Sequence, residues 1–345
     1  MKAVIITEAG TNIGFGHLTR CIALSQKLIE KKIDIEFVVN ADVSVLDLMD
    51  SNPLHLFNWI KGKQRLFKVI ESADIVIIDS YLAELNLYEE LYGKVNGKLV
   101  IIDDNIRLNY PGGIVINPSI YGDKLNYPGK EHLAYLLGKD YVILRSAFWK
   151  IARKSIRKKV ESVMVTFGGI DRANVTSLVL EVLNESYPEL EKHVIIGKGF
   201  SNIATIERLK DKKTRLEYWP DAEKMKNLML ASDVAISAGG QTLYELARVG
   251  VATIGVCVAD NQQRNVLHLD EAGFINYIGQ PGSIGFNRKL CEAVSDLKNT
   301  EDRRNRSIIG RKIVDGRGVS RIVEEILKYN RKNEEMKNEK QNTNK

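Results

Sequence analysis

Short, unbroken runs of apolar residues recur along the first half of the chain, and helical patterns separate them. The runs cover residues 3–7, 35–40, 75–79, 99–103 and 114–117, with a helical pattern from His17 to Lys31. Such runs are typical of parallel strands that helices cover on both faces, because neither face of the strand then meets water. The alternation of strand and helix therefore predicts an α/β fold with a doubly wound sheet.

The same alternation begins again in the second half, and 345 residues are long for a single core. Apolar runs cover 163–169, 193–197, 215–219, 234–240 and 252–258, with helical stretches at 222–231, 241–249 and 261–272. We expect two Rossmann-like domains, residues 1–148 and 161–330, that face each other across a cleft at the carboxyl ends of both sheets. Residues 331–345 contain few apolar side chains and are expected to be a disordered tail.

Residues 149–160, between the two expected domains, are strongly basic. The stretch "KIARKSIRKKV" carries six basic residues and no acidic one, and it accounts for a net charge of +6. Neither interleaved aromatic residues nor zinc-ligand spacing accompanies the run, so we favour a solvated linker over a surface for nucleic acid or anionic lipid. No nucleic-acid partner is expected.

Cysteine usage and hydropathy indicate a cytoplasmic protein. Cys21, Cys257 and Cys291 are far apart and lie in apolar patterns, so they are expected to be reduced core thiols. The first apolar run stops at Thr7 and Glu8, which is too early for a secretory signal, and no run reaches the length of a membrane span.

A glycine turn follows the first strand pattern, in the stretch "NIGFGHLTR". Gly14 and Gly16 would let backbone N–H groups approach an anion at the start of the next helix, where His17 lies. A histidine at this position could simply cap or pack against the helix. An imidazole with its ordinary pKa of about 6.5 is mostly neutral near pH 7, however, and is suited to accepting a proton from water.

A second glycine turn lies in "SAGGQTLYELARVG". Gly239 and Gly240 precede a helix whose N-terminus could receive a phosphate, with the Thr242 hydroxyl as a further donor. Glu245 lies one turn further along and could accept hydrogen bonds from ribose hydroxyls. The spacing fits equally well a simple glycine turn beside a solvated glutamate.

Two further strand ends carry polar groups in the second half. Gly168 and Gly169 again separate a strand from a helix, which Asp171 or Asn174 could cap. Asn261 and Gln262 begin a later helix and could reach sugar hydroxyls or amides. If the domains face each other as expected, these residues would lie at the same cleft.

Carboxylates follow two strand patterns of the first half. Asp79 follows "IVII", and Asp103 and Asp104 follow "LVII". For any one of them, capping of the next loop is the favoured interpretation. Together with Tyr81, however, they could hold His17 or a sugar at the ligand-binding edge of the sheet. The other four histidines show no metal-ligand spacing, and no metal site is expected.

These motifs together resemble a known family. The stretches "GFGHLTRCIALSQ", "IIDSY", "IIDD", "LLGKDYVILRSAF", "VTFGGIDRANVT", "ISAGGQTLYELARVG" and "DNQQRNV" follow one another over roughly residues 1–275. The set resembles the UDP-2,4-diacetamido-2,4,6-trideoxy-β-L-altropyranose hydrolases of pseudaminic acid biosynthesis and related spore-coat polysaccharide proteins. This resemblance implies the GT-B architecture, which the family shares with the UDP-GlcNAc transferase that makes lipid II.

The resemblance also implies roles for individual residues. His17 would be the catalytic base, and the UDP-binding segment would comprise Gly239, Gly240, Gln241, Thr242 and Glu245. Substrate contacts are expected from Gly14, Gly16, Arg20, Asp79, Tyr81, Asp103, Asn261 and Gln262. Arg20 makes the GHxxR form look more like the hydrolases than like the lipid-linked transferase.

The chain departs from the family pattern at two places. It has Asp79-Ser80-Tyr81 where the family often has Asp-His-Tyr, and Ile170 and Arg172 replace Ser and Pro in a Gly-Gly-Ser-Asp-Pro form. The first departure concerns the sugar pocket and the second a helix entry, so UDP use is a firmer expectation than the particular sugar.

The expected function is hydrolysis of a UDP-activated amino sugar at its anomeric carbon, with inversion and without a cofactor or metal ion. UDP is a good leaving group, so one base could replace the carboxylate pair of ordinary glycosidases. Two alternatives remain open at this point: a glycosyltransferase that uses a UDP-sugar donor, and a non-catalytic nucleotide-sugar binding protein of polysaccharide biosynthesis. A hydrolase of this kind could act as a monomer.

Overall fold

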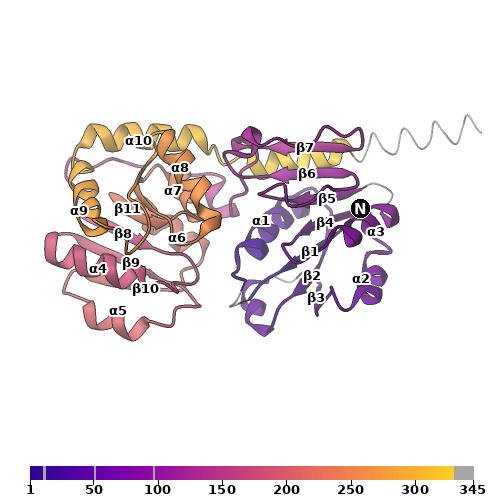
Figure 1. Ribbon diagram of the computed structural model, residues 1–345, viewed down its shortest axis with the longest axis horizontal. Coiled ribbons are helices and arrows are strands. Elements are labelled where there is room, and N and C mark those ends of the chain that lie inside the picture. The colour runs from indigo at the N-terminus through magenta and orange to yellow at the C-terminus, as the bar shows by residue number, and fades with distance from the viewer. Residues whose placement is uncertain (11–12, 50–51, 96–97, 330–345) are drawn as a thin grey trace, which may run out of the picture. The chain divides into compact units, whose positions relative to one another are not determined.

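The computed structural model describes residues 1–10, 13–49, 52–95 and 98–329. The chain forms two compact units (Figure 1). Unit 1 comprises Met1–Arg145 and the described part of Arg317–Lys345, and unit 2 comprises Ser146–Gly316. Each unit is an α/β domain built on one parallel sheet, as the apolar runs predicted.

The described part of unit 1 contains a seven-stranded parallel sheet in the order β3-β2-β1-β4-β5-β6-β7. Its strands are β1 Lys2–Glu8, β2 Asp34–Asn40, β3 Leu54–Leu56, β4 Ile75–Asp79, β5 Leu99–Ile102, β6 Gly113–Asn117 and β7 Leu133–Leu137. Its helical elements are α1 Gly16–Glu30, η1 Val43–Leu48, α2 Lys63–Ile70, α3 Leu85–Lys94, η2 Gly122–Lys124 and η3 Lys139–Tyr141. The central strands are apolar throughout because helices cover both faces of the sheet.

The described part of unit 2 contains a six-stranded parallel sheet in the order β10-β9-β8-β11-β12-β13. Its strands are β8 Ser162–Thr166, β9 Glu191–Ile196, β10 Thr214–Tyr218, β11 Val234–Ala238, β12 Ala252–Val256 and β13 Ile275–Tyr277. Its helical elements are η4 Ser146–Phe148, α4 Val175–Ser186, α5 Ile203–Leu209, α6 Ala222–Ala231, α7 Thr242–Val249, η5 Asp260–Gln262, α8 Gln263–Glu271, α9 Phe286–Asp296 and α10 Thr300–Ile313.

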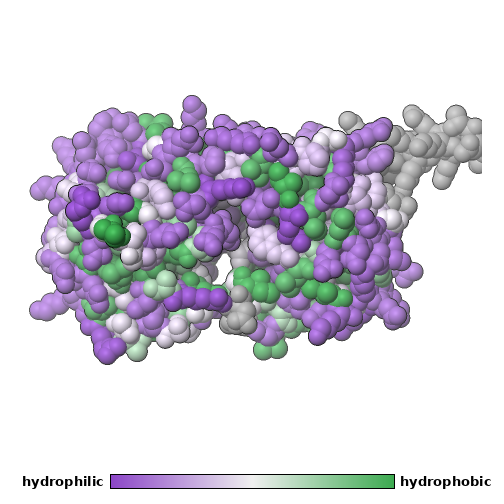
Figure 2. Space-filling view, in the orientation of Figure 1, coloured by the Kyte–Doolittle hydropathy of each residue, from purple (hydrophilic) through white to green (hydrophobic). Residues whose placement is uncertain are grey.

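Each unit has its own hydrophobic core. In unit 1, α2 and α3 pack on Val4 and Ile6 of β1 and on Val76 and Ile78 of β4. In unit 2, the cluster joins α4 and α9 to the strands β8, β9, β11 and β12. In the view of Figure 2, hydrophobic side chains at the surface form small patches among hydrophilic ones, as is usual for a globular protein.

The strand order brings particular strand ends together at the carboxyl edge of each sheet. In unit 1, Thr7 of β1 pairs with Asp79 of β4, which in turn pairs with Ile102 of β5. In unit 2, Ala238 of β11 pairs with Val256 of β12. The loops that follow these strands carry most of the predicted site residues, so the fold places them in two groups, one in each unit.

The expectation of a solvated linker at 149–160 is wrong for part of that run. Lys154 is buried, and its ammonium group donates to the carbonyl groups of Met229 and Leu230 at the end of α6. A cation is favoured there because helix C-termini expose unpaired carbonyl groups. Arg157 forms an ion pair with the buried Asp233, so this basic run belongs to the packing of unit 2.

The end of the chain also differs from the expected domain limits. The sequence analysis assigned 161–330 to the second domain, but a helical segment at 318–329 belongs to unit 1. Its apolar side chains Val319, Ile322, Val323 and Ile326 are buried. Arg321 also donates to the carbonyl group of Asp140 in unit 1. The expected tail at 331–345 lies outside the described residues.

Membrane-spanning helices, disulfides and clusters of metal-ligating side chains are not found among the described residues. None of the described helices is long and apolar enough to cross a membrane. The three cysteines are free thiols, as expected, with Cys21 and Cys257 buried and Cys291 half-buried. Within the described residues, His, Cys, Asp and Glu side chains form no group of three or more that could hold a metal ion.

Candidate active site

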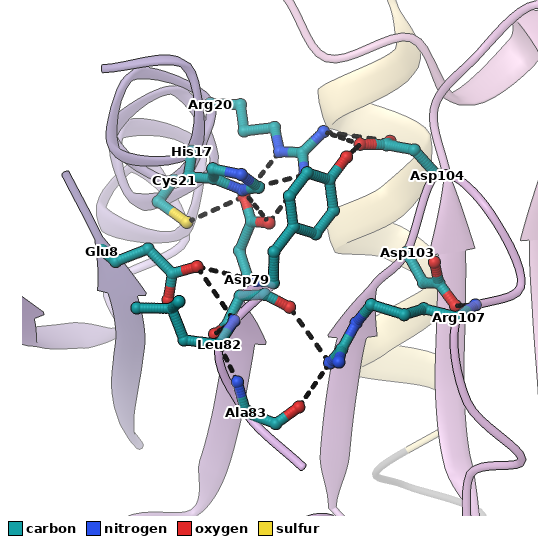
Figure 3. A network of polar contacts seen from close by, with 12 residues as sticks. Glu8, His17, Arg20, Cys21, Asp79, Leu82, Ala83, Asp103, Asp104 and Arg107 are labelled. Atoms are coloured by element: carbon teal, nitrogen blue, oxygen red, sulfur yellow. Dashed lines mark hydrogen bonds and ion pairs between the residues drawn. The ribbon is translucent and has the colours of Figure 1, made fainter. Parts of the chain in front are cut away.

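His17 lies in the first turn of α1 and contacts a buried carboxylate at the end of β4 (Figure 3). Its Nδ1 atom is 2.7 Å from Oδ1 of Asp79, a residue with no exposed surface. Asp79 therefore does more than cap the next loop, which was the favoured interpretation for a single aspartate. Its carboxylate holds the histidine, as the sequence analysis allowed.

The hydrogen bonds around Asp79 assign the proton on His17. Burial by itself would raise the pKa of Asp79, but the charges and hydrogen bonds of Arg20 and His17 hold that pKa well below its ordinary value. An ionised carboxylate only accepts hydrogen bonds, so Nδ1 of His17 must carry the proton that points to Asp79. In the neutral imidazole with its proton on Nδ1, the other ring nitrogen, Nε2, has a lone pair and could act as a general base.

Arg20 joins His17 and Asp79 to a second carboxylate. Its Nε and Nη2 atoms donate to the two oxygens of Asp79 at 2.5 and 2.6 Å, and Nη1 donates to both oxygens of Asp104 at 3.0 and 2.8 Å. Burial alone would lower the pKa of Arg20, but Asp104 and Asp79 raise it well above the ordinary value. The guanidinium therefore stays charged and fixes both carboxylates, which its planar fork of donors suits.

Tyr81 completes this group from the loop after β4. Its hydroxyl donates to Oδ2 of Asp104 at 3.0 Å, and its ring meets the His17 ring edge-on with centroids 4.6 Å apart. Burial and the neighbouring Asp104 raise the pKa of Tyr81 far above its ordinary value. The hydroxyl therefore remains a donor, and the aromatic ring restricts the orientation of the imidazole.

Asp103 has different hydrogen-bond partners from those of Asp79 and Asp104. It is buried, and its oxygens accept the N–H groups of Asn105 and Arg107 and the hydroxyl of Tyr110 at 2.8–2.9 Å. The capping interpretation thus describes Asp103, whereas Asp104 lies in the His17 group. The substrate contact that the sequence analysis assigned to Asp103 stays a prediction.

The glycine turn before α1 is closed by its own backbone. Gly14 has a φ of 91°, and the N–H groups of Gly10 and Gly14 donate to each other's carbonyl groups. Gly16 opens α1, and a Cβ atom there would meet no atom within 4 Å. Since no side chain among the described residues caps α1, its first N–H groups remain suited to a ligand anion.

The glycine turn of unit 2 is tighter than expected. The N–H group of Gly239 lies 3.0 Å from the carbonyl oxygen of Val256 and 3.1 Å from Oε1 of Gln262. A Cβ atom at Gly239 would lie 2.5 Å from Cγ1 of Val266. Protein atoms already accept the proton of this N–H, and the predicted place of Gly239 in the UDP site stays a prediction. Gly239 also allows the close approach of α8.

Gln262 holds this turn and Asn261 does not. Oε1 of Gln262 also accepts the N–H of Val258 at 3.1 Å, and its Nε2 lies beside Gly240. Asn261 is exposed. The predicted contacts of these two residues with a sugar or diphosphate stay predictions, but the carbonyl oxygen of Gln262 has a structural role that the sequence did not show.

The start of α7 keeps the features expected of an anion site. Gln241 is its N-cap residue, Thr242 is half-buried, and no side chain of the described chain caps the helix. Glu245 is only 3% exposed, so the alternative of a solvated glutamate is wrong. Leu243, Leu246, Ala247 and Val249 are buried as predicted and anchor the helix in the core.

Sequence reasoning missed two residues beside these groups and one after the edge strand β10. Glu8 ends β1 and is fully buried beside the loop that carries Tyr81. Asn265 donates to the carbonyl group of Gly239 at 2.7 Å and accepts from the hydroxyl of Tyr244. Trp219 follows β10 with a φ of 47° and is 55% exposed. A left-handed backbone is rare for a bulky residue and often marks a functional site.

A family of known proteins matches most of the second unit. Residues 163–315 match the glycosyltransferase family 28 C-terminal domain. Unit 2 is therefore similar to this glycosyltransferase domain. A crystal structure of MurG from Acinetobacter baumannii superposes with a TM-score of 0.64 at 16% identity, covering 95% of this chain and 100% of that one. The fold is therefore of the GT-B type, as the resemblance implied.

Curated relatives support the resemblance at low identity. An uncharacterised protein of Methanocaldococcus jannaschii is 25% identical over 74% of this chain, which spans only 55% of that protein. The spore coat polysaccharide biosynthesis protein SpsG of Bacillus subtilis is 23% identical, over 93% of this chain and 96% of that protein. The UDP-2,4-diacetamido-2,4,6-trideoxy-β-L-altropyranose hydrolase of Campylobacter jejuni is 21% identical, over 79% and 98%. The chain is thus related to proteins of nucleotide-sugar and polysaccharide biosynthesis.

Proposed function

We propose that this protein hydrolyses a UDP-activated amino sugar at the anomeric carbon, releasing UDP and a free 2,4-diacetamido-2,4,6-trideoxyhexose. The observation that supports the proposal is the contact of His17 Nδ1 with Asp79 at 2.7 Å, which would leave Nε2 to act as the base. The relative from Campylobacter jejuni supports this substrate class. As in that relative's name, the reaction would be a hydrolysis.

In this mechanism Nε2 of His17 takes a proton from water as the water oxygen attacks the anomeric carbon. UDP leaves from the opposite face of the sugar, so the configuration inverts. Asp79 stabilises the imidazolium that forms, and Arg20 fixes Asp79 in place. The diphosphate is a good leaving group and needs little protonation, which is consistent with a single base.

Unit 2 would hold the UDP. The uncapped first turn of α7 and the Thr242 hydroxyl would donate to the diphosphate and stabilise the negative charge that develops as it leaves. Glu245 would accept hydrogen bonds from the ribose. A buried carboxylate suits this role because it is oriented before the ligand binds.

The partner of the protein is then a small UDP-sugar. We propose that the protein acts in the cytoplasm and that a single chain is sufficient for activity. No step requires a cofactor. The domain limits of the sequence analysis stay proposals in the same sense, with the correction that 318–329 belong to unit 1.

The test is UDP release from a panel of UDP-sugars, including the diacetamido-trideoxy-altrose, with water as the only acceptor. We expect release from one or a few of these sugars, and NMR of the fresh product should show the anomer opposite to that of the substrate. Release without inversion would contradict the single-base mechanism. Binding of every sugar without release would contradict hydrolysis.

A glycosyltransferase is the second candidate, because unit 2 matches a glycosyltransferase domain and the fold matches MurG. The same base would then activate an acceptor hydroxyl in place of water. UDP release that requires an added acceptor would establish this alternative. UDP-sugar binding without turnover under either condition would instead indicate a non-catalytic binding protein.

A further inference from the structure

Glu8 is a buried carboxylate next to the His17 group that the mechanism above does not use. It is the last residue of β1 and has no exposed surface. Oε1 accepts the N–H of Tyr81 at 2.7 Å and lies 3.3 Å from that of Leu82. Oε2 is buried and has no hydrogen-bond partner among the described residues. Figure 3 shows the side chain reaching from β1 to this turn.

A carboxylate in this position lowers the stability of the fold. Burial raises the pKa of Glu8, although hydrogen bonds from Ser80 and Tyr81 and the charge of His17 act in the opposite direction. A buried charged group with an unpartnered oxygen is costly. A glutamine could accept the same backbone N–H groups without the charge, so the backbone contacts alone do not explain an acid here.

The turn that Glu8 holds is the one that places Tyr81 against His17. Ser80 reinforces it, because its Oγ accepts the N–H groups of Leu82 and Ala83 at 2.9 and 3.0 Å. Tyr81 lies between these anchors, with its ring against His17 and its hydroxyl on Asp104. Movement of this backbone would therefore change the surroundings of the imidazole.

We propose that Glu8 is a positioning residue for the His17 centre. Its carboxylate fixes the backbone of residues 81 and 82, which keeps the Tyr81 ring against His17, and its negative charge favours the imidazolium formed when His17 takes a proton. The charged groups that act on Glu8 are His17 from α1 and Asp79 from β4, and the latter opposes its ionisation. The proposal rests on the proposed function, since it assigns His17 the role of base.

The first test is Glu8→Gln, with Glu84→Gln as a matched control, because Glu84 is an exposed acid just beyond the same turn. We expect kcat of Glu8→Gln to fall by roughly 10- to 100-fold, since small misplacements of catalytic groups have effects of this size, with KM within about twofold. The acid limb of the pH–rate profile should move to lower pH, because the imidazolium loses a nearby negative charge. Glu84→Gln should change none of these values.

Thermal stability separates this role from a purely structural one. A raised pKa in the folded state means that the carboxyl group favours folding below its unfolded pKa and disfavours it as the pH rises. Glu8→Gln should therefore unfold at the same temperature as the wild type or higher at pH 7, with the difference shrinking toward pH 4. Wild-type kcat and an unmoved acid limb in this variant would overturn the proposal.

Ser80→Ala is the second variant, to be used if Glu8→Gln does not fold. It removes the hydroxyl that accepts the N–H groups of Leu82 and Ala83 in the turn but keeps the Glu8 carboxylate. We expect a smaller fall in kcat in the same direction with KM unchanged. Wild-type turnover in Ser80→Ala would count against the proposal in that case.

A measurement without turnover distinguishes this proposal from the proposed function. NMR of the protein with 13C-labelled histidine should show that Glu8→Gln shifts the ring signals of His17, while His55, His132, His193 and His268 keep theirs. If the wild type releases no UDP but these shifts occur, the hydrolase fails and the positioning role of Glu8 remains. Unchanged His17 signals would overturn the role of Glu8 whether or not the protein is a hydrolase.

Discussion

The two units use the same local geometry for different chemistry. In each, a helix begins just after a glycine turn at the carboxyl edge of a parallel sheet: α1 in unit 1 and α7 in unit 2. The start of α1 carries His17 and, one turn later, Arg20, and these side chains bind two aspartates. The first turn of α7 carries Thr242 and a buried Glu245 on a helix anchored by apolar side chains. Under the proposed function, unit 1 would move a proton and unit 2 would hold the diphosphate anion.

The glycine turns of the two units also differ in their hydrogen bonds and in the space around them. Gly10 and Gly14 bond to each other, and Gly16 has open space around it. Gly239 instead lies against α8, with its N–H accepted by protein atoms. A glycine pair in a sequence thus indicates a tight turn, but not whether its N–H groups face a ligand or the protein itself.

Asp79→Asn should have the largest effect on this comparison. The amide would no longer hold the proton on Nδ1 of His17 reliably or balance the charge of Arg20, so we expect kcat to fall by roughly 10³- to 10⁴-fold. Stability should fall by about 3–5 kcal/mol, as for a broken buried ion pair. Turnover and chemical denaturation measure the two effects, with Asp34→Asn as an exposed control.

The pH dependence of the same variant sharpens the test. Asp79 has a lowered pKa in the folded state, so its stabilisation is present above its unfolded pKa of about 3.9 and is lost only as the pH falls below that value. The difference in stability between wild type and Asp79→Asn should therefore persist from pH 7 to pH 5. A difference that already disappears at pH 5 would contradict the ion-pair account.

Glu245→Ala should test the UDP-binding role proposed for unit 2. Loss of hydrogen bonds from the ribose to a charged acceptor should weaken UDP binding by roughly 10- to 100-fold, or about 1.5–3 kcal/mol, while kcat at saturating substrate changes little. Titration calorimetry with UDP measures the affinity, and Glu245→Gln serves as the control of similar size with an intermediate effect. Wild-type affinity in Glu245→Ala would remove this residue from the UDP site.

Gly239→Ala should act through packing. The added methyl group would lie 2.5 Å from Val266, so stability should fall by about 1–3 kcal/mol and UDP binding should weaken as α7 and α8 shift. Gly240→Ala is the matched control, because its nearest neighbour would be 3.8 Å away. Equal stability of the two variants, measured by thermal unfolding, would contradict the described turn.

Tyr81→Phe should give the smallest effect. It removes the hydroxyl bond to Asp104 but keeps the ring against His17. We expect kcat to fall by roughly 2- to 12-fold, which corresponds to one hydrogen bond, with UDP affinity unchanged. A loss as large as that of Asp79→Asn in the same assay would mean that the Tyr81 hydroxyl contacts the substrate directly.

Local patterns predicted ten of the thirteen strands in the described chain, because burial and backbone geometry act over a few residues. They missed β3, β7 and β13, which lie at the edges of the two sheets. They did not separate Asp79 from Asp103, since both follow an apolar strand. The difference lies in contacts from other elements: Arg20 and His17 reach Asp79, whereas Asp103 receives Tyr110 and its own loop. Arg20, one turn after His17, was the available signal for an ion pair.

Glu8 and the helix at 318–329 show the same limit. In the sequence, Glu8 is simply the polar residue that ends an apolar run. It lies beside Tyr81 because β1 and β4 are neighbours in the sheet. The apolar spacing of Val319, Ile322, Val323 and Ile326 indicates a helix with a buried face, but not which unit covers that face. Such assignments depend on contacts between residues far apart in the sequence.

The most direct test of the division between the units is the UDP affinity of His17→Asn, measured by titration calorimetry beside its turnover. The account predicts that UDP release falls by roughly 10²- to 10⁴-fold while the Kd for UDP stays within about twofold of the wild-type value. A Kd weakened in proportion to turnover would place His17 in the UDP site and contradict its role as the base.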